Sequence, residues 1–505
     1  MYQIETENIR LRRNSQRGLL NYSLIFFITA FGIIIVGFLG RGGHWLAMVY
    51  LMVLFLLTIV PWILINKQRR SYLTVLLLTQ VLMFSLEAFF LRLGLFNVFR
   101  YLEESWHPLI SQEILRKAGW LVILGNIALW VGYVLPFLKP VGERLHVFFK
   151  DWANKVISIS EFRIWLLFFI GLAARFYIQS NNLGGYFSYD ANERIGALAY
   201  IQYIWLIENL TILSLVVYFC EQLQKGRKAN WFGFLLMLLL ELATVFLGGF
   251  KGAVIFRIIY LAIAYAYIRE EFPWKLAAAG LMILILIMPV NLMMRTEYSS
   301  GYSEIESGRI STIVSGSFSA LGSVISDETE YSFVSTPERF IRQSAQLQDF
   351  SMAVQFVDRT GFSMNGAELL NIFFSFIPRA IWPSKPIVSL GGWFNTEVYG
   401  GGPNNAAAIT VPGDFYLNFG WLGVPIGMLL YGALLRVITV GLLETKASIR
   451  LASLVPFIVL GLGQPSSELG GHLGGLIRQL IFFTIILTLF LLPSEAKITA
   501  SIEGS

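Results

Sequence analysis

Two cations lie within a proline-rich stretch of an otherwise apolar chain, FIPRAIWPSKP at residues 376–386. Its three prolines fix φ and remove backbone donors, so we expect a stiff, non-helical segment that holds Arg379 and Lys385 in set directions. Trp382 suits the depth of a membrane interface, where an aromatic ring with one donor is at home. The stretch is therefore typical either of a site for a lipid-linked anion or of an amphipathic anchor without chemistry.

Candidate acid and base groups follow it in the sequence. Asp414 lies in VPGDFYLNFGWLGVPIG (411–427), just before a long apolar run. It is either a charge partner of a helix N-terminus or a general base for a sugar hydroxyl. Glu468 and His472 lie four residues apart in GQPSSELGGHLGG, where they can share a hydrogen bond if the segment is helical. The alternative is a plain outer turn.

Further cations lie within or beside apolar runs, where a charge is costly and usually faces a partner or a cavity. They are Arg175, Arg257, Arg295 and Lys251, the last in the glycine turn LGGFKGA (247–253). Arginine forks suit diphosphate oxygens, and exposed backbone N–H groups at a helix start favour anions. The ordinary explanations are an ion pair such as Glu241 with Arg257 and a hairpin with a snorkelling lysine. We expect these cations and Arg379 to share one cavity that opens to the outer leaflet.

The amino-acid composition is that of an integral membrane protein. The mean hydropathy is +0.64, with 56% hydrophobic and only 14% charged residues among 505, and these values are far from a soluble chain. Cys220 is the single cysteine, which excludes an intrachain disulfide. The net charge of +6 is concentrated in short loops, as expected for topology rather than nucleic-acid binding. Motifs of nucleotide hydrolases, zinc proteases and serine hydrolases are missing, and we expect neither a metal nor a cofactor.

About twelve apolar segments are long enough to be membrane spans. They lie near residues 21–40, 44–65, 72–95, 119–138, 164–180, 199–222, 230–249, 251–268, 275–294, 415–442, 451–463 and 475–493. Every loop with several basic residues then faces the side of the N-terminus. The sequence therefore predicts an all-α polytopic membrane protein with both termini in the cytoplasm.

The same alternation divides the chain into three parts. Residues 1–294 hold spans one to nine, 295–414 form a large outer loop, and 415–505 hold the last three spans and a tail. Within the loop, residues 344–360 show helical spacing of apolar side chains and predict an amphipathic helix. The glycine-rich stretch 391–414 predicts irregular structure. We expect function to lie in this loop and in the two shorter outer stretches at about 96–118 and 181–198.

At FIPRAIWPSKP, GDFYLNFGWLGVPIG and the GGFKGA turn, the chain resembles the Wzy-type oligosaccharide repeat-unit polymerases, the O-antigen and exopolysaccharide polymerases of the bacterial inner membrane. The layout of nearly the whole chain is similar, but specific motifs are confined to about 248–253 and 376–427. Relatives often carry Ser-Arg in the glycine turn. This chain has Phe250-Lys251, which keeps the charge and loses the bidentate geometry.

The resemblance implies a GT-C-like fold and a glycosyltransferase active outside the cytoplasm. A growing glycan moves from undecaprenyl diphosphate to the non-reducing end of an undecaprenyl-diphosphate-linked repeat unit, without nucleotide or metal. Membrane lipids, a chain-length regulator and a flippase are the implied partners. Arg379, Asp414, Glu468 and His472 are then the catalytic candidates, and Lys251, Arg295, Arg379, Lys385, Arg175 and Arg257 bind diphosphate. A glycan ligase and a lipid-linked-oligosaccharide flippase or other transporter are the alternatives.

Overall fold

The computed structural model is helical throughout the part of the chain that it describes, with no strand there. Those residues are 110–154, 160–181, 201–226, 229–246, 251–283, 346–375, 390–402, 406–445, 448–464 and 468–491, together with residues 322, 377, 381, 382, 384 and 385. The first three predicted spans and both termini lie outside the described residues.

The helices of the bundle follow one another along the chain. They are α6 (Gln112–Val134), α7 (Lys139–Asn154), α8 (Glu161–Ser180), α10 (Leu210–Lys225), α11 (Trp231–Phe246), α12 (Lys251–Arg269), α19 (Val411–Ile438), α20 (Ile449–Leu462) and α21 (Leu469–Ile486). A π-helical segment extends α19 through Thr439–Leu443 and another extends α21 through Leu487–Leu491. The predicted large loop contributes α16 (Gln346–Thr360), the 3₁₀ turn η5 (Glu368–Leu370), α17 (Asn371–Phe374) and α18 (Gly391–Glu397).

Four of the described helices are long and apolar enough to cross a membrane: Lys117–Val134, Ile201–Lys225, Val411–Leu443 and Leu469–Leu491. Shorter apolar helices cover Trp231–Phe246, Trp274–Ile283 and Ile449–Leu462. The predicted all-α membrane class is thus supported by composition and helix length, while the count of twelve spans remains a prediction.

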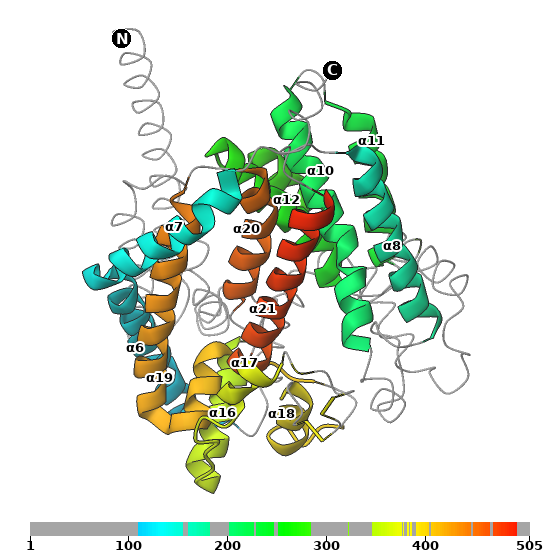
Figure 1. Cartoon of the computed structure of the whole chain (residues 1–505). Helices are drawn as coiled ribbons and strands as arrows, with labels where there is room; N and C mark the ends of the chain where they lie inside the picture. Colours follow the sequence, from blue (N-terminus) through cyan, green and yellow to red (C-terminus); the bar gives the residue numbers. More distant parts are fainter. Residues whose placement is uncertain are drawn as a thin grey trace, which may run out of the picture.

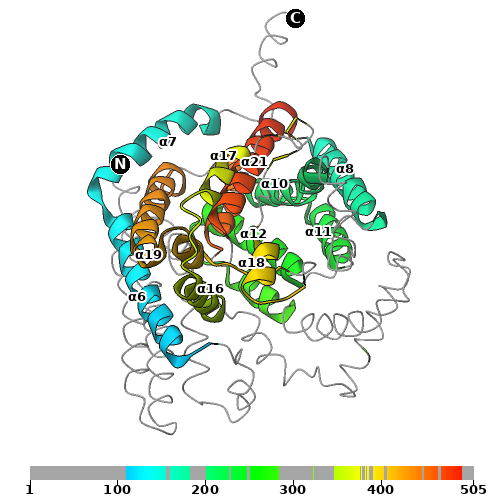
Figure 2. The same ribbon diagram turned by 90° about the horizontal axis from the view of Figure 1, so that it is seen from below.

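The loop helices gather at one end of the bundle. Figure 1 shows α16, α17 and α18 beside the first turns of α19 and α21, while α7 lies at the opposite end. Seen from below, α16 and α18 overlap the middle of the bundle in projection (Figure 2). The described helices of the predicted outer loop and α7 are therefore at opposite ends of the bundle.

Helices α6 and α19 pack most closely, because glycines lie at their crossing. A β-carbon on Gly132 would meet the Leu429 carbonyl oxygen, and one on Gly432 would meet the Leu129 carbonyl oxygen. The two backbones therefore touch directly. This contact anchors α19, which carries Asp414.

Helix α19 is not one straight span, as the prediction of a single segment at 415–442 assumed. Gly420 has φ 63° and ψ −151°, which interrupts the helix nine residues after it begins. Thr410 forms the N-cap and its hydroxyl accepts the Gly413 N–H at 3.1 Å. The first segment, 411–419, therefore turns away from the spanning segment at the lower end of the bundle (Figure 1).

One loop prediction needs correction and one is confirmed. The basic segment 139–163, between two predicted spans, contains the amphipathic helix α7, whose Gly142 packs on Val440. The stretch 391–414 was expected to be irregular, yet it contains α18 and the start of α19. The amphipathic helix predicted at 344–360 is confirmed as α16.

Candidate functional site

A pair of buried carboxyl groups meets the first turn of α21. The Leu469 N–H donates to Asp414 Oδ2 at 2.8 Å, and the Gly470 N–H donates to Glu368 Oε1 at 2.7 Å. Asn418 Nδ2 donates to Asp414 Oδ1 at 3.1 Å. The N-terminal N–H groups of a helix favour negative charge, so this turn stabilises an anion shared by the two side chains. Asp414 and Glu368 are called the acid pair below.

Glycines let the acid pair approach α21. A β-carbon on Gly470 would collide with the Glu368 carboxyl and carbonyl oxygens, and one on Gly474 would collide with Ser375. The two glycines lie four residues apart and so share one face of the helix. The GGHLGG segment is therefore helical, rather than a plain outer turn, and receives η5 and α17 on its glycine face.

The remaining candidates near α21 take different positions. Glu468 is the N-cap residue of α21, and its negative charge adds to the burial that raises the pKa of Glu368. The His472 ring bonds through Nε2 to the Gly461 carbonyl oxygen at 2.6 Å, which ties α21 to the end of α20. Of the three predicted acid-base residues, Asp414 thus belongs to the acid pair, Glu468 lies beside it, and His472 is engaged with the backbone.

Burial raises the pKa of Glu368, and the hydrogen bond from the Gly470 N–H opposes this rise. The two carboxyl groups accept from consecutive N–H groups of α21 and therefore lie side by side. Adjacent carboxyl groups do not both ionise readily, so the pair is suited to hold one proton and one negative charge. Such a pair can accept or deliver a proton.

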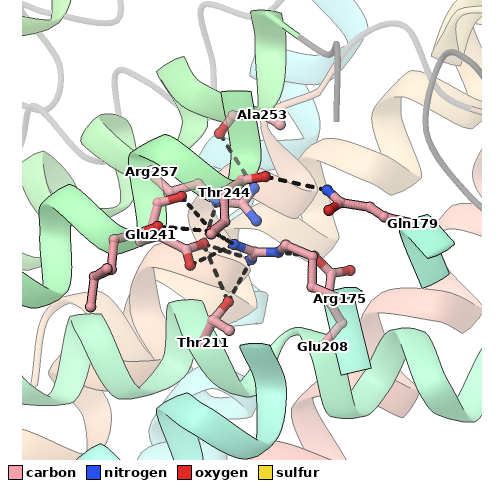
Figure 3. A network of polar contacts seen from close by, with 9 residues as sticks. Arg175, Gln179, Glu208, Thr211, Glu241, Thr244, Ala253 and Arg257 are labelled. Carbon is pink, nitrogen blue, oxygen red and sulfur yellow. Dashed lines mark hydrogen bonds and ion pairs between the residues drawn. The ribbon is translucent and has the colours of Figure 1, made fainter. Parts of the chain in front are cut away.

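A second cluster joins Arg175 to two glutamates inside the bundle (Figure 3). The Arg175 guanidinium donates to Glu208 Oε1 at 2.9 Å and to the two oxygens of Glu241 at 2.8 Å each. It also donates to Thr211 and Thr244 at 2.7 Å each. These five bonds use all five N–H groups of an arginine.

Arg257 also bonds to Glu241, but not all of its N–H groups have an acceptor among the described residues. Its Nε donates to Glu241 Oε1 at 2.9 Å and its Nη1 donates to the Ala253 carbonyl oxygen at 3.3 Å. No described residue accepts a hydrogen bond from Nη2, and 12% of the side chain is exposed. Arg257 therefore keeps N–H donors for a ligand, whereas Arg175 has none to spare. The structural pairing of Glu241 with Arg257 occurs, and Arg175 completes it.

Lys385 and Arg478 act on the loop near α17. Lys385 is 5% exposed and donates to the Ile377 carbonyl oxygen at 3.0 Å, which closes the proline-rich stretch on itself. Arg478 on α21 donates to Gln202 at 2.9 Å and to the Ser375 carbonyl oxygen at 3.2 Å. Arg478, not anticipated from the sequence, thus links the loop to two bundle helices.

Other predicted diphosphate ligands cannot be placed. Arg295 and Arg379 lie outside the described residues, and so does the side chain of Lys251, whose backbone begins α12. Their shared cavity with Arg175 and Arg257 remains a prediction. Within the described part of the chain, no group of three or more His, Cys, Asp or Glu residues is placed to hold a metal ion.

Asp349 joins the loop helices and predicts a pH effect. Tyr399 donates to its Oδ1 at 2.6 Å, and burial raises the pKa of Asp349 to about 7 despite this bond. Because the folded pKa exceeds the unfolded value, the protonated form stabilises the fold. That contribution is complete below about pH 4 and is lost as pH rises to 7.

We expect Asp349→Asn to raise stability more at pH 8 than at pH 5, by about 1–3 kcal/mol at pH 8, since the amide removes the buried charge. Thermal unfolding of the purified protein at both values measures this. Tyr399→Phe is the comparison variant and should steepen the loss with pH, because the bond that opposes the pKa rise disappears. Equal stabilisation by Asp349→Asn at both pH values would contradict the assignment.

Glu368 is the residue of this site that sequence reasoning missed. It precedes two leucines in GAELLN, and nothing in that segment marks it for chemistry. The available signal was the glycine pair of GGHLGG, which indicates that another backbone packs closely on α21.

No curated protein and no solved structure matches the sequence. One family model does, and it covers Glu208, Glu241, Arg257, Glu368 and Asp414, while α8 and α21 lie outside its range. The match extends over residues 186–445, just over half of the chain, and the chain therefore belongs to the family described as a domain of unknown function (DUF8712).

Proposed function

We propose that this chain is a membrane glycosyltransferase that polymerises lipid-linked oligosaccharides. In the reaction, a growing glycan leaves undecaprenyl diphosphate and joins the non-reducing end of a repeat unit carried by a second undecaprenyl diphosphate. Diphosphate is a good leaving group whose negative charge grows in the transition state, so fixed cations stabilise its departure. The acceptor hydroxyl needs a base.

The acid pair carries this proposal. It lies at the end of the bundle where α16, α17 and α18 gather, in line with the prediction that residues 295–414 lie outside the cytoplasm. A buried carboxyl pair on a helix N-terminus is suited to proton transfer from a hydroxyl group. Packing alone would be served as well by apolar side chains.

The cations give secondary support. Arg257 retains N–H donors beside the first turn of α12, where backbone N–H groups also favour an anion. Arg379 and Lys251 are proposed to complete this diphosphate site, and Arg175 to hold Glu241 in place. Lys385 is assigned to the shape of the proline-rich stretch rather than to the headgroup.

The finer description belongs to the same proposal. It comprises about twelve spans in a GT-C-like arrangement, with both termini in the cytoplasm of a bacterial inner membrane and the site on the outer side. A chain-length regulator and a flippase would act on the same lipid-linked glycan before or after this step.

Deletion of the gene in its bacterium tests the function. We expect glycan gels to show loss of the polymer ladder, with a single repeat unit still attached to its carrier lipid. Polymer that forms but stays unattached would instead assign the chain to glycan ligation. Repeat units that never reach the outer leaflet would indicate the flippase.

A further inference from the structure

The two members of the acid pair differ in how their oxygens are bonded. Both oxygens of Asp414 accept hydrogen bonds, from Asn418 and from the Leu469 N–H. Glu368 Oε1 accepts the Gly470 N–H, but Oε2 is buried and receives no N–H or hydroxyl donor from the described residues. Glu368 therefore has the oxygen that is open to a further partner.

That open oxygen is costly to a residue with only a packing role. A buried acceptor without a donor loses the hydrogen bonds that water would give it and is destabilising. A glutamate that served only to cap α21 needs one oxygen, and glutamine would provide it. The unpaired Oε2 thus points to a partner that arrives during function.

Burial decides which member of the pair carries the charge. Asp414 is 0% exposed and Glu368 is 5% exposed, so ionisation costs more at Asp414 than at Glu368. Asp414 therefore holds the proton of the pair, and Glu368 carries the charge. The neighbouring charge of Glu468, on α21, strengthens the affinity of Glu368 for a proton.

We infer that Glu368 is the general base of the transfer, with protonated Asp414 as its positioning residue. This inference rests on the function proposed above. The acceptor hydroxyl oxygen forms a bond to the anomeric carbon of the donor glycan, and the bond from that carbon to the diphosphate oxygen breaks. The electron pair leaves with the diphosphate, and the hydroxyl proton moves to Glu368 Oε2.

The test compares amide variants at the two positions, because an amide imitates a protonated carboxyl group but not a base. Purified proteins at matched levels act on repeat units extracted from the deletion strain. We expect Glu368→Gln to lower the rate by roughly 10²-fold and Asp414→Asn by less than about tenfold, since the amide preserves the bond to Leu469. Glu143→Gln, an exposed change on α7, is the matched control and should keep the wild-type rate.

Two further measurements separate catalysis from structure. Glu368→Gln should unfold within a few degrees of wild type, because the Gln oxygen still accepts the Gly470 N–H, and Glu368→Asp should recover part of the rate. The wild-type rate should fall on acidification as Glu368 gains a proton, and the residual rate of Glu368→Gln should lack that acidic fall.

The outcomes distinguish the two proposals. An inactive wild-type protein on intact repeat units removes the polymerase and its base together. If the wild type is active and Glu368→Gln stays within about tenfold of it, only the base assignment is overturned. If Asp414→Asn is inactive while Glu368→Gln is active, Asp414 rather than Glu368 is the base, and the inference is overturned.

Discussion

Replacing Arg175 by alanine is expected to destabilise the protein by about 3–5 kcal/mol. The side chain is 3% exposed and donates five hydrogen bonds, three of them to carboxylates. Its loss leaves Glu241 Oε2 without its arginine, and the alanine makes no hydrogen bond in its place. Removal of one partner of a buried ion pair is costly because the other charge stays in a low dielectric.

The measurement is thermal unfolding of the purified protein in one detergent, with the folded yield after extraction as a second reading. Lys139→Ala removes an exposed pair with Glu143 at 3.8 Å and is the control, for which the expected change is below about 0.5 kcal/mol. A stable Arg175→Ala protein would mean that the network is not structural, and Arg175 would return to the list of diphosphate ligands.

Runs of apolar residues located most of the described bundle helices, but neither α7 nor the break in α19. Hydropathy reports how apolar a segment is, and the residues around Gly420 are Phe419 and Trp421, both half exposed. The φ of 63° at Gly420 adds no polarity that a window could detect. Only the identity of the residue, a glycine, permits the break.

The acid pair was half visible in the sequence. Asp414 was identified because it directly precedes an apolar run, where a carboxylate is conspicuous. Glu368 lies 102 residues from the glycine whose N–H it accepts, and its partner cannot be inferred from local spacing. Long-range pairing of this kind depends on how η5 and α17 pack on α21.

For the buried cations, the sequence predicted that they have partners but not how many acceptors surround each one. Their types and depths predicted that they face partners, and Arg175 and Arg257 do. Whether all N–H groups of an arginine are hydrogen-bonded within the protein depends on the number of acceptors around its guanidinium. Thr211 and Thr244 supply two acceptors to Arg175, and a threonine in an apolar helix carries no such signal.

Arg257→Ala is expected to fold and to lose polymerisation by roughly 10²–10³-fold. The variant keeps the two bonds from Arg175 to Glu241, so the network loses one interaction rather than its centre. The missing N–H donors are the ones that no described residue uses. Loss of one donor to a developing negative charge has an effect of this size when the site excludes water.

Polymerisation by purified variants on extracted repeat units measures the effect, beside thermal unfolding of the same samples. Arg257→Lys should recover little of the rate, because one ammonium group cannot both bond Glu241 and present a fork to phosphate oxygens. Arg269→Ala removes an arginine from the other end of α12, where it donates to the Leu223 carbonyl oxygen, and should stay within about twofold of wild type. If Arg257→Ala polymerises at the wild-type rate, the diphosphate does not bind beside Glu241, and Arg257 only supports the ion network of Arg175.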